Sequence, residues 1–143
     1  MGISRQQKQI HKVMIVEDEL DILLLYKDFL RSKGYSVIVS STFADEILID
    51  YEKYMPDLVI IDYKLPGKKN GLQATREILG KYSLTPILLV TAFENVKEEL
   101  SKDEFFSDKK IQILIKPVKL ARLAQAIQNI NNEQNLKSTT FYL

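Results

Sequence analysis

The chain has 143 residues, a length typical of one domain with a single hydrophobic core, and its 45% hydrophobic and 27% charged residues argue against a disordered or fibrous protein. A formal net charge of +1 provides no surplus of positive charge for binding a nucleic-acid backbone. The absence of cysteine excludes disulfides, thiolate zinc sites and a cysteine nucleophile.

The N-terminal residues 1–12 contain no apolar core of a signal peptide, and no apolar run in the sequence is long enough to span a bilayer. The single histidine, His11, cannot build a histidine-rich metal site alone. We therefore expect a cytoplasmic protein that binds neither membranes nor nucleic acids.

Short apolar runs, most of them β-branched, predict five strands. Strands covered on one face alternate apolar with polar residues, and most of these runs do not, so we expect burial on both faces. The runs are residues 13–16, 37–39, 58–61, 87–90 and 111–115, of which 37–39 is the weakest.

Segments with helical periodicity follow each predicted strand. They cover residues 18–33, 43–51, 71–80, 95–102 and 120–130, of which 95–102 is the least regular. The polar residues 131–143 predict a frayed tail without regular structure.

Strand and helix thus alternate five times, which predicts an α/β fold, because right-handed strand–helix–strand connections cover both faces of a parallel sheet. We expect a flavodoxin-like doubly wound five-stranded sheet of order 2-1-3-4-5 with five helices. The predicted organisation is an N-terminal extension at 1–10, one domain at 11–131 and a flexible C-terminal tail at 132–143.

Charged and polar side chains come directly after the predicted strands. In such a sheet the carboxyl ends of the strands meet at one edge, where ligands bind. The residues expected to converge there are Glu17 and Asp18 after the first strand, Asp62 after the third, Thr91 after the fourth and Lys116 after the fifth.

This group of residues predicts a specific chemistry. Carboxylates held together repel one another, so they raise their pKa values or bind a cation, and an all-oxygen site favours a hard ion such as Mg²⁺. A carboxylate beside such an ion can attack phosphorus to form an acyl phosphate. The metal and Lys116 would neutralise the phosphoryl oxygens, and Thr91 could hydrogen-bond one of them.

Each residue also has a structural interpretation. Asp18 could cap a helix, and Asp62 could form a turn. Thr91 is a common residue at a strand end, and Lys116 could be a solvated charge. Their coincidence at four strand ends favours the functional interpretation.

A highly specific pattern is formed by four stretches: VMIVEDE at 13–19, PDLVIIDYKLPG at 56–67, LVTA at 89–92 and IKPV at 115–118. With these stretches the sequence resembles the receiver domain of two-component response regulators over about residues 11–131, as a stand-alone, single-domain protein. The resemblance implies that Asp62 is the phosphoacceptor. It also implies that Mg²⁺ or Mn²⁺ is bound by Asp18, Asp62 and the backbone carbonyl of Lys64, with help from Glu17.

In the same resemblance Thr91 is the switch hydroxyl, Lys116 contacts the phosphoryl group, and the Lys116–Pro117 bond is cis. The donor would be a phosphohistidine on a histidine kinase or a histidine phosphotransfer protein, and the output would go to an unknown downstream protein. The protein would be a switch with slow autodephosphorylation rather than a turnover enzyme, and a homodimer fits the family's habits.

Three features depart from the family pattern. The loop at 66–71 is one residue longer and carries Lys68 and Lys69. Ile113 stands where receivers commonly have an aromatic residue. The segment 93–110 lacks the usual small residues, so we expect a short or irregular helix there, with Phe105 and Phe106 packed in the core. We expect this least regular segment to be the mobile output face.

Two other functions compete with phosphoryl capture. A receiver-like interaction module could act independently of phosphorylation, which the missing aromatic residue at Ile113 favours weakly. A phosphatase with an aspartyl nucleophile usually carries a second acid two residues after the nucleophile, and Lys64 occupies that position here.

Overall fold

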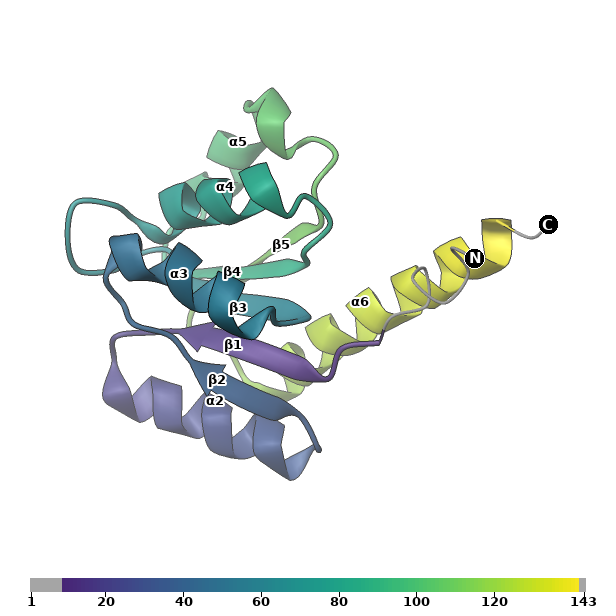
Figure 1. Cartoon of the computed structure of the whole chain (residues 1–143), viewed down its shortest axis with the longest axis horizontal. Coiled ribbons are helices and arrows are strands. Elements are labelled where there is room, and N and C mark those ends of the chain that lie inside the picture. Colours follow the sequence, from purple (N-terminus) through teal and green to yellow (C-terminus); the bar gives the residue numbers. More distant parts are fainter. Residues whose placement is uncertain (1–8, 142–143) are drawn as a thin grey trace.

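A parallel sheet forms the centre of the protein in a computed structural model that describes residues 9–141, with the backbone alone for Ala44 and residues 134–141 (Figure 1). The strands are β1 (Lys12–Val16), β2 (Ser36–Val39), β3 (Leu58–Asp62), β4 (Ile87–Thr91) and β5 (Ile111–Ile115). Their order in the sheet is β2-β1-β3-β4-β5, so the predicted flavodoxin-like topology is confirmed.

Five α-helices in the described part of the chain cover both faces of the sheet, as predicted. They are α2 (Leu20–Ser32), α3 (Ala44–Tyr54), α4 (Gly71–Lys81), α5 (Asn95–Ser101) and α6 (Leu120–Phe141). The helices α3, α4 and α5 lie on one face, and α2 and α6 lie on the other (Figure 1).

The central strands separate two hydrophobic cores. Every residue of β3 and β4 is buried. Ile61 and Leu89 belong to the core under α3 and α4, whereas their neighbours Ile60 and Leu88 belong to the core under α2 and α6. Because successive side chains of a strand point to opposite faces, a strand between two cores is apolar throughout, which explains the uninterrupted apolar runs.

The helix α4 begins directly against the end of β3. The Gly71 N–H donates to the Tyr63 carbonyl at 2.6 Å, and a Cβ added at Gly71 would lie 2.0 Å from the Asp62 carbonyl oxygen. Asn70 and Gln73 cap this end reciprocally, since the side chain of each accepts the backbone N–H of the other. The longer loop after Asp62 therefore ends in a tightly defined helix start.

The segment 93–110 contains short elements, as predicted. The helix α5 has seven residues, and a single 3₁₀ turn, η1 (Glu104–Phe106), precedes β5. Phe106 is buried in the core under α4, and Phe105 and Ile113 pack against the same core from partly exposed positions. The expected core packing of the two phenylalanines is confirmed.

The C-terminal helix is longer than the sequence predicted. The helix α6 continues through residues 132–141, for which we expected a tail without regular structure, and residues 142–143 lie outside the described residues. The flexibility of this tail stays a prediction. None of the helices within residues 9–141 combines the length and apolar character needed to cross a bilayer.

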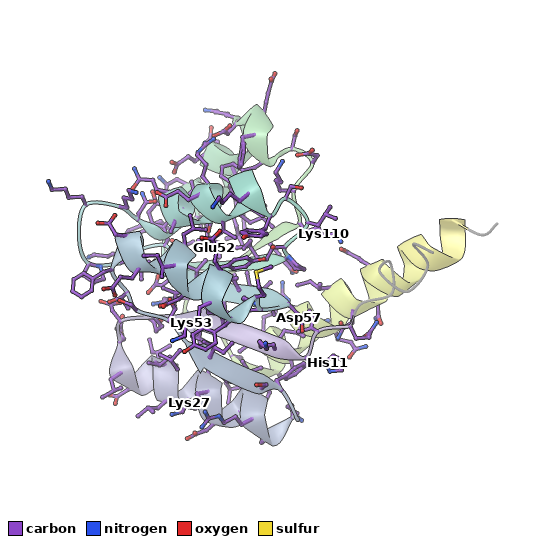
Figure 2. All side chains as sticks on the ribbon, in the orientation of Figure 1. His11, Lys27, Glu52, Lys53, Asp57 and Lys110 are labelled. Atoms are coloured by element: carbon purple, nitrogen blue, oxygen red, sulfur yellow. The ribbon has the colours of Figure 1, made fainter. Side chains whose placement is uncertain are left out.

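The N-terminal end of the domain is fixed by buried contacts. Most of the predicted extension, residues 1–8, lies outside the described residues, but Ile10 is buried and donates its N–H to the side chain of Asn131 in α6 at 3.1 Å. The backbone N–H groups of His11 and Lys12 both donate to the Asp57 carboxylate, at 3.0 and 2.9 Å. The single histidine therefore lies at the amino edge of the sheet, next to Asp57 (Figure 2).

Candidate functional site

The carboxyl edge of the sheet brings together all five side chains that the sequence pointed to. Glu17 and Asp18 follow β1, Asp62 ends β3, Thr91 ends β4 and Lys116 follows β5. The strand register sets these positions side by side, because Val16 pairs with Ile61, Asp62 with Val90, and Thr91 with Ile115. All five predicted residues except Glu17, which lies beside Asp18 and Asp62, line a surface hollow, the acidic pocket. The pocket is lined by Asp18, Glu19, Asp62, Lys64, Leu65, Pro66, Thr91, Ala92, Phe93 and Lys116.

Three carboxylates converge in the acidic pocket. One oxygen each from Glu17, Asp18 and Asp62 lies within 4.8 Å of the other two. Glu17 and Asp62 are buried, at 4% and 6% exposure, whereas Asp18 is exposed. Asp18 does not occupy the helix cap that a purely structural role would give it, because Glu19 is the N-cap residue of α2.

Lys116 is the cation that balances the buried acids. Its Nζ lies 2.8 Å from Asp62 Oδ2 and 3.4 Å from Glu17 Oε1. Burial alone would lower the pKa of Lys116, but the hydrogen bonds and charges of Asp62 and Glu17 outweigh burial and raise it above its usual value. The peptide bond from Lys116 to Pro117 is cis, as expected.

The buried acids exceed what one lysine can compensate. The pKa of Glu17 is raised to about 7, because burial, the hydrogen bond to Asp62 and the Asp62 charge outweigh the lowering by the Glu19 N–H and Lys116. A hard cation would remove the repulsion among these carboxylates, because such a cation binds oxygen donors and holds them deprotonated. The all-oxygen donor set therefore fits Mg²⁺.

Thr91 is buried at 1% exposure and its hydroxyl is held by the loop that follows β4. The Phe93 N–H donates to Thr91 Oγ1 at 3.0 Å, which leaves the Thr91 hydroxyl proton available to another acceptor. Thr91 and Phe93 both line the acidic pocket, so an added phosphoryl group would meet both donors.

The loop after Asp62 closes another side of the acidic pocket. The Lys64 N–H points back to Asp62 Oδ1 at 3.3 Å, and the Lys64 side chain is exposed. The sequence did not reveal that α4 presses on this strand end, because the requirement for glycine at position 71 depends on the position of the Asp62 carbonyl. It also gave no sign that Tyr63 and Phe93 would form a ring contact.

The fold and the pocket define a class: an α/β protein with a cluster of three carboxylates, able to hold a cation, at the carboxyl edge of a doubly wound sheet. The family model of the response regulator receiver domain matches residues 13–128. The chain therefore belongs to the response regulator receiver domain family.

Solved structures of receiver domains show the same fold. A CheY-like receiver domain protein from Methanospirillum hungatei is 23% identical with a TM-score of 0.75, and the match covers 90% of this chain and 99% of that one. The chemotaxis response regulator CheY4 of Vibrio cholerae is 22% identical with a TM-score of 0.72, covering 85% and 99%. A CheX–CheY–BeF₃–Mg complex from Borrelia burgdorferi matches at 23% identity and a TM-score of 0.72, covering 84% and 88%.

Membership of this family sets the general function. Receiver domains are phosphoacceptor signalling switches rather than turnover enzymes. They bind Mg²⁺ at an acidic pocket and interact with histidine kinases or phosphotransfer proteins. The present chain therefore belongs to a family of signalling switches, and its acidic pocket is the candidate site.

Proposed function

We propose that Asp62 accepts a phosphoryl group from a phosphohistidine donor in a two-component phosphorelay, with a divalent metal ion bound beside it. The observation that carries the proposal is the position of the Asp62 carboxylate, which lies 2.8 Å from the Lys116 ammonium and within 4.8 Å of an oxygen from each of two further carboxylates. This arrangement supplies a nucleophile and a set of charges that stabilise a phosphoryl group in transfer.

Glu17, Asp18, Asp62 and the backbone carbonyl of Lys64 would hold Mg²⁺, or Mn²⁺, with Glu17 assisting through water. When bound, the ion supplies positive charge to neutralise the phosphoryl oxygens. An oxygen of Asp62 attacks phosphorus, the P–N bond to the donor imidazole breaks, and the electron pair leaves with the imidazole nitrogen. The product is an aspartyl phosphate.

Lys116 and Thr91 would stabilise this product. Lys116 already contacts Asp62 Oδ2, so its ammonium can donate to a phosphoryl oxygen placed there. The Thr91 hydroxyl can donate to a second oxygen while it still accepts from Phe93. Slow attack of water on phosphorus would later return Asp62 to its free carboxylate.

The proposed partners follow from this chemistry. The donor is a histidine kinase or a histidine phosphotransfer protein, and residues 11–131 form the unit that accepts the phosphoryl group. The phosphorylated surface then binds a downstream protein or a second copy, and we place the protein in the cytoplasm. The Borrelia burgdorferi complex, whose description includes BeF₃ and Mg²⁺, supports the choice of ligands.

Intact mass after incubation with Mg²⁺ and acetyl phosphate tests the proposal. We expect the wild type to gain one phosphoryl group and Asp62→Asn to gain none. Absence of an adduct on the wild type, together with absence of Mg²⁺ binding, would instead favour an interaction module that works without phosphorylation. Rapid multiple turnover of a phosphate ester would favour a phosphatase, which the exposed Lys64 two residues after Asp62 argues against.

A further inference from the structure

The described residues contain an aromatic contact next to the phosphoacceptor that the phosphoryl chemistry does not use. The rings of Tyr63 and Phe93 meet edge to face, with centroids 6.5 Å apart and an interplanar angle of 72°. Tyr63 directly follows Asp62, and Phe93 lies two residues after Thr91. The contact therefore joins the two strand ends that would respond first to a phosphoryl group.

Tyr63 and its ring partner Phe93 are linked to the two helices next to this contact. Asn70, the N-cap residue of α4, donates its side-chain N–H to the Tyr63 hydroxyl at 3.4 Å. Burial raises the pKa of Tyr63, and the carboxylate of Glu99 in α5 raises it further through its charge and a hydrogen bond. The Tyr63 hydroxyl thus bonds the N-cap residue of α4, and the carbonyl of its ring partner Phe93 accepts the Val96 N–H of α5 at 3.3 Å. Both helices lie on the same face of the sheet (Figure 1).

The backbone of Tyr63 cannot absorb a displacement easily. Its N–H donates to the Val90 carbonyl at 2.7 Å, and its carbonyl accepts the Gly71 N–H at 2.6 Å. A change around Asp62 would therefore be passed on by the Tyr63 side chain rather than by a shift of the strand end. The Tyr63 ring is only partly buried and packs at the margin of the core, so fewer neighbours confine it than confine a fully buried ring.

The opposite end of the contact is linked to the Thr91 hydroxyl. The Phe93 N–H donates to Thr91 Oγ1, and both residues line the acidic pocket. A phosphoryl group on Asp62 would bring new, strongly accepting oxygens to these two donors. Phe93 would then have two arrangements, one with its N–H on Thr91 and one with its N–H turned to a phosphoryl oxygen.

We propose that Tyr63 is a positioning residue that carries the phosphorylation signal from Thr91 and Phe93 to the start of α4 and to α5. This inference rests on the proposed phosphorylation of Asp62. Ile113, which stands in β5 where receivers commonly have an aromatic residue, offers no ring for such a relay. The relay consists of direct contacts between neighbouring groups. The group that accepts the Phe93 N–H, either Thr91 Oγ1 or a phosphoryl oxygen, determines which of two arrangements of the relay is favoured.

Hydrogen exchange on the full chain, with and without Mg²⁺ and beryllium trifluoride, tests the relay. In the wild type we expect the mimic to change exchange in the first turn of α4 and in α5. Tyr63→Phe keeps the ring but removes the hydroxyl, so the change in these two elements should be weaker. Tyr63→Leu removes the ring contact as well, so the change should be lost. Both variants should gain one phosphoryl group from acetyl phosphate at the wild-type rate.

Tyr82→Phe is the matched control. It also removes a tyrosine hydroxyl that bonds a carboxylate, Glu52, at 2.8 Å, but at the other end of α4. Its exchange response should equal that of the wild type. If the wild type forms the adduct, and Tyr63→Phe and Tyr63→Leu show the same exchange response as the wild type, the relay is wrong but the proposed function stands. No adduct on the wild type would overturn the proposed function, and the relay with it.

Discussion

The acidic pocket and the segment 93–110 hold their functional groups in different ways. The acids of the pocket stand at the ends of β1 and β3, strands that are buried almost throughout, so their positions follow from the sheet itself. The segment 93–110 lies outside the sheet, and its short elements pack on the rest of the protein through side chains such as Val96 and Phe106. Arg76 of α4 lies over the rings of Phe105 and Phe106 at 4.8 and 5.0 Å and pairs with Asp103.

The acidic pocket is suited to the capture of a phosphoryl group, and the segment 93–110 is suited to the conformational response. Capture requires charges at fixed distances, which a buried sheet provides without reorganisation. A response requires an element that changes its packing at modest cost, and contacts between partly exposed groups each contribute only about 1 kcal/mol or less. Substitutions in the acidic pocket should therefore change the rate of phosphorylation strongly. Substitutions in the segment 93–110 should change stability and hydrogen exchange only slightly.

The largest effect is expected for Lys116→Ala. Loss of the ammonium 2.8 Å from Asp62 removes charge from the phosphoryl oxygens, so phosphorylation by acetyl phosphate should slow by about 100-fold or more. Mg²⁺ binding should persist because the three carboxylates remain. Time-resolved intact mass and Mg²⁺ titration measure the two quantities, with the exposed Lys119→Ala as control. Phosphorylation at the wild-type rate would show that Lys116 has no role in transfer.

Gly71→Ala should destabilise the protein by about 3 kcal/mol, because the added Cβ would lie 2.0 Å from the Asp62 carbonyl oxygen and force the start of α4 away from β3. Gly80→Ala provides the matched control in the same helix, since its Cβ would meet nothing within 4 Å. That control should gain up to about 1 kcal/mol from the better helix propensity of alanine. Urea unfolding compares the two variants, and equal stabilities would contradict the close approach of α4 to Asp62.

The affinity for Mg²⁺ should depend on pH through Glu17. Burial and the neighbouring Asp62 together raise the pKa of Glu17 to about 7, so the side chain is protonated below that pH, and the metal must displace the proton to bind. The affinity should therefore fall as the pH drops below 7, by up to about tenfold per pH unit. Glu17→Gln cannot release this proton and should show a flatter pH dependence. Identical profiles in calorimetric titrations would rule out Glu17 as the linked group.

Arg76→Ala should have the smallest effect. The Arg76 side chain is half exposed, and its loss removes an ion pair with Asp103 and the stacking on two rings, which together contribute about 1 kcal/mol. Hydrogen exchange should become faster in η1 while phosphorylation of Asp62 stays unchanged. Arg122→Ala, an exposed arginine of α6, is the control. A loss of phosphorylation in Arg76→Ala would show that the segment 93–110 does affect the chemistry of the acidic pocket.

The features that could be predicted from the sequence are those that burial imposes locally. Strands between two cores are apolar throughout, so β3 and β4 were visible as runs, and the residues after them marked the acidic pocket. The requirement for glycine at position 71 could not be predicted, because it depends on a carbonyl brought near by the fold. The contact of Tyr63 with Phe93 could not be predicted either, because the fold brings these two residues together from different strand ends. The length of α6 was underestimated because its last residues are polar and lack a helical stripe.

Trapping the phosphorylated protein with borohydride tests the central claim most directly. Borohydride reduces an aspartyl phosphate to homoserine, so the mass of each peptide after digestion identifies the residue that carried the phosphoryl group. We predict that the modified residue is Asp62, in the peptide that contains the end of β3, and that no other carboxylate is reduced. Modification of Glu17 or Asp18 instead, or a phosphoryl group that resists reduction because it lies on Thr91, would contradict the assignment of Asp62 as the phosphoacceptor.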